Sequence, residues 1–216
     1  MESVKHQCPI CLLNGQVQED ADGEEIFLIK CLRCGSYRIS KEVCKVLNTV
    51  TFKSYVLSGF IRTSNLQEEI PSLDLDLIQE VDQNFSLLTL EQKEKNLIAY
   101  MGMKAELGEA CEINSLFDYP LIFAREKAEL NWLISEMIKE GVLDRREKPK
   151  SMFPISKGTV TNEVHKVTLT KKGFEKMNAF KALSTSGSMT ETSVKTSRQK
   201  RKVFKLLTRI CGLIVA

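Results

Sequence analysis

Two pairs of cysteines near the start of the chain constrain its fold more than any other feature. Cys8 and Cys11 form one C-x2-C pair, Cys31 and Cys34 form a second, and nineteen residues separate the pairs. This spacing lets four thiolates converge on one tetrahedral Zn²⁺ ion. We interpret the four residues as a structural zinc site. Two reduced thiol pairs, a redox disulfide and a rubredoxin-like iron site are the alternatives.

The residues around the second pair have the pattern of two short strands. Residues 26–29 are apolar and lead into Cys31, and residues 36–39 alternate between polar and apolar side chains. With the cysteines, they predict an antiparallel zinc ribbon over residues 1–39. A unit of this size buries too little apolar surface to fold alone. We therefore expect the ion to supply on the order of 10 kcal/mol of its folding free energy.

Helices are expected after the ribbon. Ser40 has the character of an N-cap for a short helix, and apolar patterns predict two more helices over about 51–67 and 74–82. These three form a helical connector over residues 40–87. A fourth helix begins after Thr89, because Thr89-Leu90-Glu91-Gln92 is a capping-box sequence.

The second half of the chain alternates strands and helices. A short strand is expected at 110–113, and a helix over about 122–140 has one buried face, made of Leu130, Leu133, Ile134, Met137 and Ile138. Gly141 ends this helix. Strands follow at 142–144 and 166–169, before a last helix. The fold class predicted for the whole chain is α+β, mainly α.

Three pieces of this half carry a resemblance to a known family. They read Leu130-Asn131-Trp132-Leu133-Ile134, Glu140-Gly141-Val142-Leu143 and Leu169-Thr170-Lys171-Lys172-Gly173-Phe174. They resemble winged-helix domains of bacterial regulators, in which a leucine-rich recognition helix precedes a GVL turn and an LTxxG exit from the wing. The resemblance implies a winged-helix-like domain over residues 88–183. It departs from the family at 115–123, which leaves little room for the helix before the recognition helix.

A looser resemblance spans the ribbon, the helical middle and the winged-helix-like part. The helical middle contributes Leu57-Ser58-Gly59-Phe60-Ile61-Arg62. Together these regions are similar to the N-terminal parts of uncharacterised bacterial proteins, including defence proteins, that continue into a nucleotide-processing or TIR-like effector domain. The resemblance implies a sensor module that either stands alone or is a truncated form of a larger effector protein.

Charge is distributed unevenly along the chain, although the net charge is only +3. Residues 1–39 and 40–124 carry net charges of −2 and −6, whereas residues 125–183 and 184–216 carry +5 and +6. The acidic first half repels an anionic partner. We therefore expect such a partner to meet the second half.

The basic residues of the second half gather in two places. One is the loop between the last two strands, with Arg145, Arg146, Lys148, Lys150 and Lys157. The other follows a Ser/Thr-rich flexible linker over 184–199 and opens an amphipathic tail over 200–216 with Lys200, Arg201 and Lys202. We predict that these side chains bind nucleic-acid phosphates with little base reading. The alternatives are a solvated loop and, for the tail, self-association or weak contact with a membrane surface.

One exposed face of the 122–140 helix is a candidate interface. A step of about 100° per residue places Trp132, Arg125 and Lys139 opposite the buried stripe. Trp132 either packs against the helices of residues 40–107 or binds a protein or nucleic-acid partner. Glu129 and Glu136 on the same side oppose close approach to phosphates.

Catalysis has little support in the sequence. The only histidines are His6 and His165, and the chain has neither a nucleophile elbow nor a phosphate-binding loop. The start lacks the apolar run of a signal peptide, and the seven cysteines fit a reducing cytoplasm. The sequence therefore predicts a cytoplasmic, zinc-binding, non-enzymatic nucleic-acid-binding regulator or sensor. The alternative is a protein-interaction or oligomerisation module.

Overall fold

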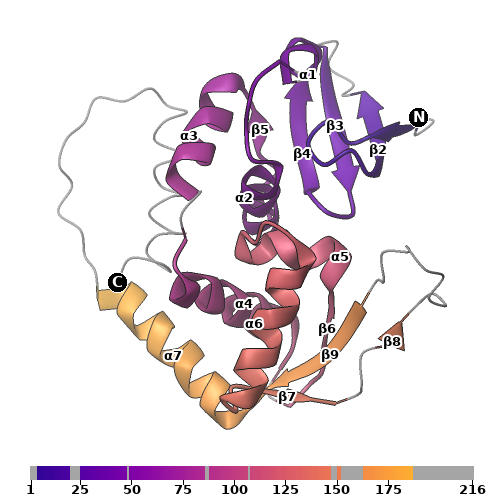
Figure 1. Ribbon diagram of the computed structural model, residues 1–216. Helices are drawn as coiled ribbons and strands as arrows, with labels where there is room; N and C mark the ends of the chain where they lie inside the picture. The colour runs from indigo at the N-terminus through magenta and orange to yellow at the C-terminus, as the bar shows by residue number, and fades with distance from the viewer. Residues whose placement is uncertain are drawn as a thin grey trace.

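A five-stranded sheet occupies the first part of the chain (Figure 1). The computed structural model describes residues 4–19, 25–47, 49–85, 88–106, 108–146, 150–151 and 163–186. The strands follow in chain order across the sheet: β1 (Val4–Gln7), β2 (Asn14–Glu19), β3 (Ile26–Cys31), β4 (Gly35–Ser40) and β5 (Ser72–Leu73). Neighbouring strands are antiparallel, except that β4 and β5 are parallel.

Two hairpins of this sheet place the cysteine pairs. Strands β1 and β2 pair as far as Gln7 and Asn14, so the first cysteine pair lies in the turn between them. Strands β3 and β4 pair as far as Cys31 and Gly35, so the second turn holds the other pair. Both strands predicted for the ribbon are confirmed. The sheet has more strands than predicted. Strands β1, β2 and β5 are polar or short, so no apolar pattern predicts them, and backbone pairing holds them in the sheet.

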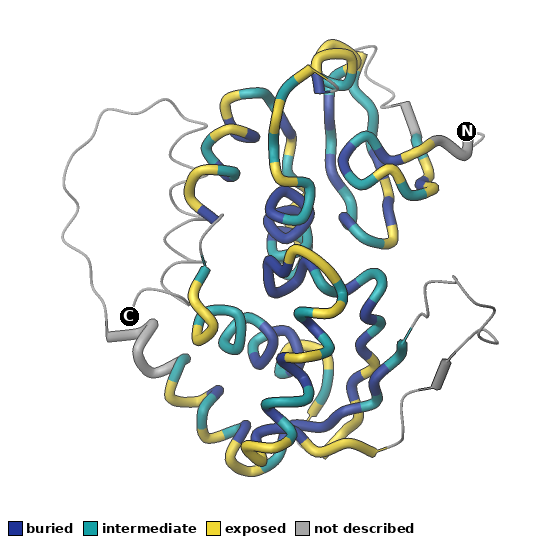
Figure 2. The backbone as a smooth tube through the Cα atoms, in the orientation of Figure 1, coloured by how far each residue is buried: buried dark blue, intermediate teal, exposed yellow. Residues whose placement is uncertain are grey.

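Helices α1 (Lys41–Leu47), α2 (Ser54–Leu66) and α3 (Leu75–Phe85) complete the part we call the first lobe, residues 4–85. Ser40 Oγ accepts a hydrogen bond from the N–H of Val43 at 3.2 Å, which confirms the predicted cap of α1. Helix α2 is buried along most of its length and shares one core with β4 and α3 (Figure 2). The ribbon therefore does not pack alone.

The second lobe, residues 88–186, starts with α4 (Leu90–Lys104). The predicted capping box is confirmed: the N–H of Gln92 donates to Thr89 Oγ1 at 3.3 Å, and the N–H of Thr89 donates to Gln92 Oε1 at 2.8 Å. The remaining elements are β6 (Cys111–Asn114), α5 (Ser115–Asp118), the 3-10 helix η1 (Tyr119–Ile122), α6 (Lys127–Lys139), β7 (Leu143–Arg145), β8 (Lys150–Ser151), β9 (Glu163–Leu169) and α7 (Lys171–Ser186). The second sheet has the order β6-β9-β7, and β8 also pairs with β9.

Helix α6 presents the predicted apolar face to the second core, where Leu130, Leu133, Ile134 and Met137 are buried. It begins at Lys127, later than the predicted residue 122, because η1 precedes it and Phe123 takes a left-handed φ of 53°. Gly141 follows the helix with a φ of 70°, as predicted. The N–H of Val142 then donates to the carbonyl of Met137 at 2.9 Å.

Helix α2 and η1 join the two lobes at close range. A Cβ on Gly59 would lie 2.5 Å from the carbonyl oxygen of Pro120, so only glycine lets the two backbones approach this closely. Phe123, which follows η1, stacks on Phe85 with ring centroids 5.2 Å apart. The first core is therefore closed by a residue from the second half of the chain.

Apart from Phe123, the buried residues of the two cores lie on either side of residues 86–87, near the predicted boundary at residue 88. Helix α7 runs to Ser186, three residues into the predicted linker, which starts at residue 184. The rest of the linker and the tail over 200–216 lie outside the described residues. The five-part domain division stays a prediction, while the mixed α+β class is confirmed.

Candidate metal centre and the contacts that hold it

The four predicted cysteines come together at the tips of the two hairpins. Their sulfur atoms all lie within 4.8 Å of one another. The Sγ atoms of Cys8 and Cys34 are 3.7 Å apart, and those of Cys11 and Cys31 are 3.4 Å apart. A tetrahedral zinc ion with Zn–S bonds of about 2.3 Å needs sulfur atoms about 3.8 Å apart. The four cysteines are thus close enough to bind a metal ion.

The turn that carries the first pair has a tight backbone. The N–H of Cys8 donates to the carbonyl of Leu13 at 2.7 Å, and the N–H of Leu12 donates to the carbonyl of Cys8 at 2.8 Å. Leu12 takes a left-handed φ of 60° to close the turn. The backbone of this turn therefore fixes the positions of Cys8 and Cys11.

The turn that carries the second pair depends on a glycine. Gly35 has a φ of 87°, and a Cβ there would lie 2.3 Å from Asn65 Oδ1. That oxygen accepts the N–H of Ser36 at 2.6 Å. The N–H of Cys34 points at Cys31 Sγ at 3.5 Å, so a backbone dipole offsets thiolate charge. Gly35 thus takes a left-handed conformation that glycine adopts without a Cβ clash.

Two hydroxyl groups approach the sulfurs from behind. Tyr37 Oη lies 3.1 Å from Cys8 Sγ, and Ser58 Oγ lies 3.1 Å from Cys34 Sγ. Burial raises the pKa of Tyr37, so its hydroxyl keeps the proton that it can donate to a thiolate. Ser58 already donates to the carbonyl of Ser54 at 2.7 Å, so it accepts from the Cys34 thiol in the metal-free protein. No local sequence pattern predicts either hydroxyl, because packing alone brings them to the sulfurs.

The thiols share protons unevenly. A hydrogen bond from Cys11 lowers the pKa of Cys8 to about 7, and another lowers the pKa of Cys31 far below its usual range. Hydrogen bonding within the cluster raises the pKa of Cys11 and of Cys34. Hydrogen bonds within the metal-free cluster therefore hold protons on part of its thiols. A metal ion that binds all four sulfurs has to release them.

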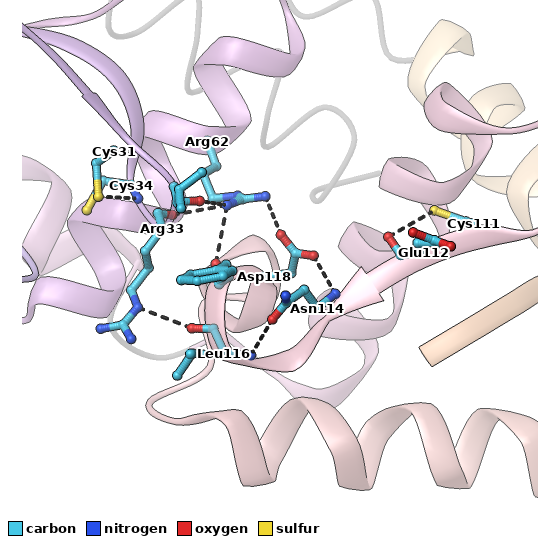
Figure 3. Close-up of polar contacts among 11 residues, drawn as sticks. Cys31, Arg33, Cys34, Arg62, Cys111, Glu112, Asn114, Leu116 and Asp118 are labelled. Atoms are coloured by element: carbon cyan, nitrogen blue, oxygen red, sulfur yellow. Dashed lines mark hydrogen bonds and ion pairs between the residues drawn. The ribbon is translucent and has the colours of Figure 1, made fainter. Parts of the chain in front are cut away.

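Arg62 of α2 connects the second turn to the second lobe (Figure 3). Its guanidinium donates to the carbonyls of Leu32 at 2.9 Å and Arg33 at 3.1 Å, and to that of Phe117 in α5 at 3.2 Å. It also pairs with Asp118 Oδ1 at 2.5 Å, and only 15% and 10% of the two side chains are exposed. This network was missed by the sequence reasoning. The sequence feature that pointed to it is Arg62, the single charged residue of the mostly apolar α2.

Asp118 and Arg33 extend the connection. Asp118 Oδ2 accepts the N–H of Asn114 at 2.7 Å, which holds the start of α5. Arg33 Nε donates to the carbonyl of Leu116 at 3.3 Å, and its guanidinium lies 5.2 Å from the centre of the Tyr119 ring. The second cysteine turn is therefore fastened to both α5 and η1.

The predicted nucleic-acid-binding residues are only partly within the described chain. Arg145 and Arg146 are exposed at the end of β7. Within the part of the chain that the structure describes, neither forms an ion pair. For Lys150 only the backbone is described, in β8. The others lie outside the described residues: Lys148, Lys157, Lys200, Arg201 and Lys202.

The predicted interface residues lie on or just before α6. Trp132 is 49% exposed, so the helices of residues 40–107 do not bury it. Arg125 is exposed as well. Lys139 is exposed and pairs with Glu136 at 2.7 Å. Glu129 accepts from Lys93 and from the N–H of Arg125, which partly neutralises the acidic side of this face.

The helices of the described residues are too short or too polar to traverse a lipid bilayer. Comparison with protein families, with curated proteins and with solved structures gave no match to this chain.

Proposed function

We propose that the chain is a zinc-stabilised, non-enzymatic nucleic-acid-binding module of the reducing cytoplasm. Four cysteine thiolates form the donor set of a mostly buried site. Two hydroxyl groups lie next to their sulfur atoms. Zinc is the ion that such a set favours, and a fourth thiolate leaves no open coordination position for a substrate. The metal therefore stabilises the first lobe and takes no part in a reaction.

The topology of the second lobe supports a winged-helix-like arrangement. Helix α6 leads directly into β7, a long connection separates β7 from β9, and the sheet order is β6-β9-β7. In this arrangement α6 takes the place of the recognition helix, and the connection takes the place of the wing. The four-residue α5 and η1 stand where the preceding helix is usually longer. The short segment 115–123 thus holds only α5 and η1 in place of a longer helix.

The exposed pair Arg145 and Arg146 at the root of this connection is the observation that carries nucleic-acid binding. The segment around them, residues 125–183, has a net charge of +5. The acidic residues of α6 are already paired, Glu129 with Lys93 and Glu136 with Lys139. The acidic residues of α6 therefore add little repulsion against phosphates at the basic connection. Binding through phosphates implies strong salt dependence and weak sequence preference.

Replacing both Arg145 and Arg146 with alanine is expected to weaken nucleic-acid binding at least tenfold at low salt. Two lost phosphate contacts should also reduce the slope of log K against log salt by about 2 for duplex DNA. Fluorescence anisotropy with labelled duplex and single-stranded DNA and RNA, at several salt concentrations, measures both quantities.

The matched control removes two exposed cations of the first lobe, Lys30→Ala with Lys45→Ala. It has the same net charge as the arginine variant and should bind almost as well as the unchanged protein. If both variants lost the same affinity for nucleic acid, the binding would depend on net charge alone. Absence of binding by the unchanged protein at low salt would end the proposal.

The exposure of Trp132 favours a second function, a protein-interaction or self-association module. A half-exposed tryptophan on a helix flanked by Arg125 and Lys139 is typical of an interface anchor. If two copies associate through it, light scattering on the full chain gives a dimer, and Trp132→Ser gives a monomer. A monomer in both cases contradicts self-association through this face. The exposed Leu90→Ser variant serves as a control for the loss of surface apolar area.

A further inference from the structure

A mostly apolar cavity of about 280 Å³ opens where α2, α4, η1 and α7 meet. Part of its lining faces solvent. Leu66 of α2, Ala99 of α4 and Phe180 of α7 are half-buried, and Met103 of α4 is 53% exposed. None of the four clustered cysteines lines this cavity, and neither do the two exposed arginines of β7. The cavity is therefore an apolar surface that neither proposed function uses.

Helix α7 leads the rest of the chain away from this cavity at close range. The helix packs against α4 (Figure 1), carries Phe180 in the lining and ends at Ser186. At 1.5 Å per residue, its end lies about 9 Å beyond Phe180 along the helix axis. Residues 187–199 follow, in the part that the sequence predicts to be a flexible linker. A flexible linker of this length spans about 20 Å, so the tail that starts at residue 200 can reach the cavity.

The sequence of the tail has the apolar pattern that such a cavity accepts. On a helix, one face of the tail would hold four apolar side chains: Val203, Leu206, Leu207 and Ile210. Lys205 would lie on the opposite face. A cavity of about 150 Å³ accepts benzene, so one of about 280 Å³ accepts two side chains of leucine size. Their burial would remove apolar surface of both the tail and the cavity from water.

Charge favours the same placement. All of the lining outside α7 belongs to the segment 40–124, which has a net charge of −6. Glu68 and Glu106, just beyond the ends of α2 and α4, are exposed. The segment 184–216, which contains the tail, has a net charge of +6. The tail and the surroundings of the cavity therefore attract each other.

We propose that the tail docks in this cavity of its own chain, with its apolar face against α4 and α7 and Lys205 directed to solvent. The short linker holds the tail at an effective concentration in the millimolar range. A contact that is weak between separate molecules is therefore well populated within one chain. Docking involves no phosphate, so the proposal is independent of nucleic-acid binding.

A fluorescently labelled peptide of residues 200–216 tests the proposal in titrations with the full chain, in the absence of nucleic acid. In the unchanged protein, the chain's own tail competes with the peptide for the cavity. Leu206→Ser with Ile210→Ser in the chain removes this competition, so the variant should bind the peptide at least tenfold more tightly than the unchanged protein. Fluorescence anisotropy measures both affinities. Equal affinities, or no binding to the variant, would overturn the proposal.

Two controls separate apolar docking from attraction by charge. Thr196→Ser with Thr208→Ser leaves the apolar face of the tail intact, so this chain should bind the peptide as weakly as the unchanged protein. A peptide that itself carries Leu206→Ser and Ile210→Ser keeps every charge and should bind the released cavity at least tenfold more weakly than the natural peptide. Equal binding of the two peptides would contradict docking through the apolar face.

Changes in the lining locate the contact. Adding Ala99→Leu to the chain that carries Leu206→Ser and Ile210→Ser fills the cavity and should weaken binding of the natural peptide at least tenfold. Thermal unfolding checks that this variant is folded. Met103→Ser at an exposed position repeats the test without a change in the core, and it should weaken the peptide at least threefold. Unchanged affinity in both lining variants would place the peptide elsewhere and reject the cavity.

Light scattering distinguishes docking within one chain from docking between two copies. The mass of the unchanged chain and of the variant with Leu206→Ser and Ile210→Ser should be the same. A dimer that becomes a monomer in this variant would place the tail on a second copy and contradict docking within one chain.

Discussion

Replacing Cys31 with serine is expected to abolish tight zinc binding and to unfold the sheet of the first lobe. Cys31 Sγ lies 3.4 Å from Cys11 Sγ and accepts the N–H of Cys34, so it is central to the cluster. A serine hydroxyl is a poor zinc ligand at neutral pH. A structural zinc site contributes on the order of 10 kcal/mol, and the loss should therefore exceed about 3 kcal/mol. Zinc content by mass spectrometry and chemical unfolding measure the two effects.

The matched control is Cys44→Ser in α1, where a half-buried cysteine lies outside the cluster. This variant should keep one zinc ion per chain and nearly full stability. The second lobe has its own core around α6 and β9, so its amide hydrogens should stay protected from exchange in the Cys31 variant. Unchanged zinc content after Cys31→Ser would show that the four cysteines do not form the metal site.

The features that the sequence predicts well are the local ones. The cysteine spacing identifies the four thiols that cluster, the Thr89 to Gln92 capping box predicts the start of α4, and a regular apolar stripe predicts the buried face of α6. The capping box and the stripe each lie within a few helical turns, and each cysteine pair spans four residues. Such a local pattern therefore predicts its element without knowledge of distant contacts.

The features that the sequence does not reveal depend on distant partners. Strand β2 is polar and exists because β1 and β3 pair on either side of it. Helix α6 starts late because η1 packs against α2, which no local pattern encodes. Tyr37 and Ser58 reach the sulfurs only after β4 and α2 have packed. The clustering of the four cysteines was predictable from their spacing, and the groups around them were not.

Arg62→Met is expected to lower the free energy of unfolding by about 3–5 kcal/mol, the usual result of leaving one partner of a buried ion pair alone. Asp118 would keep a charge in a site where only 10% of its side chain is exposed. Three carbonyl oxygens would also lose their donor, two in the second cysteine turn and one in α5. Because the variant loosens that turn, zinc should dissociate faster as well. Urea unfolding and transfer of zinc to a chelator measure both effects.

The control pair is Lys53 and Asp82, which lie 3.3 Å apart with 45% and 24% of their side chains exposed. Lys53→Met should cost no more than about 1 kcal/mol, because water screens this pair. The double variant Arg62→Met with Asp118→Leu should recover part of the loss, since it removes the unpaired charge while the three carbonyls stay without a donor. If Arg62→Met cost no more than Lys53→Met, the network would not couple the cysteine turn to the second lobe. The contacts of Arg33 with Leu116 and Tyr119 and the packing of α2 against η1 would then join the two lobes.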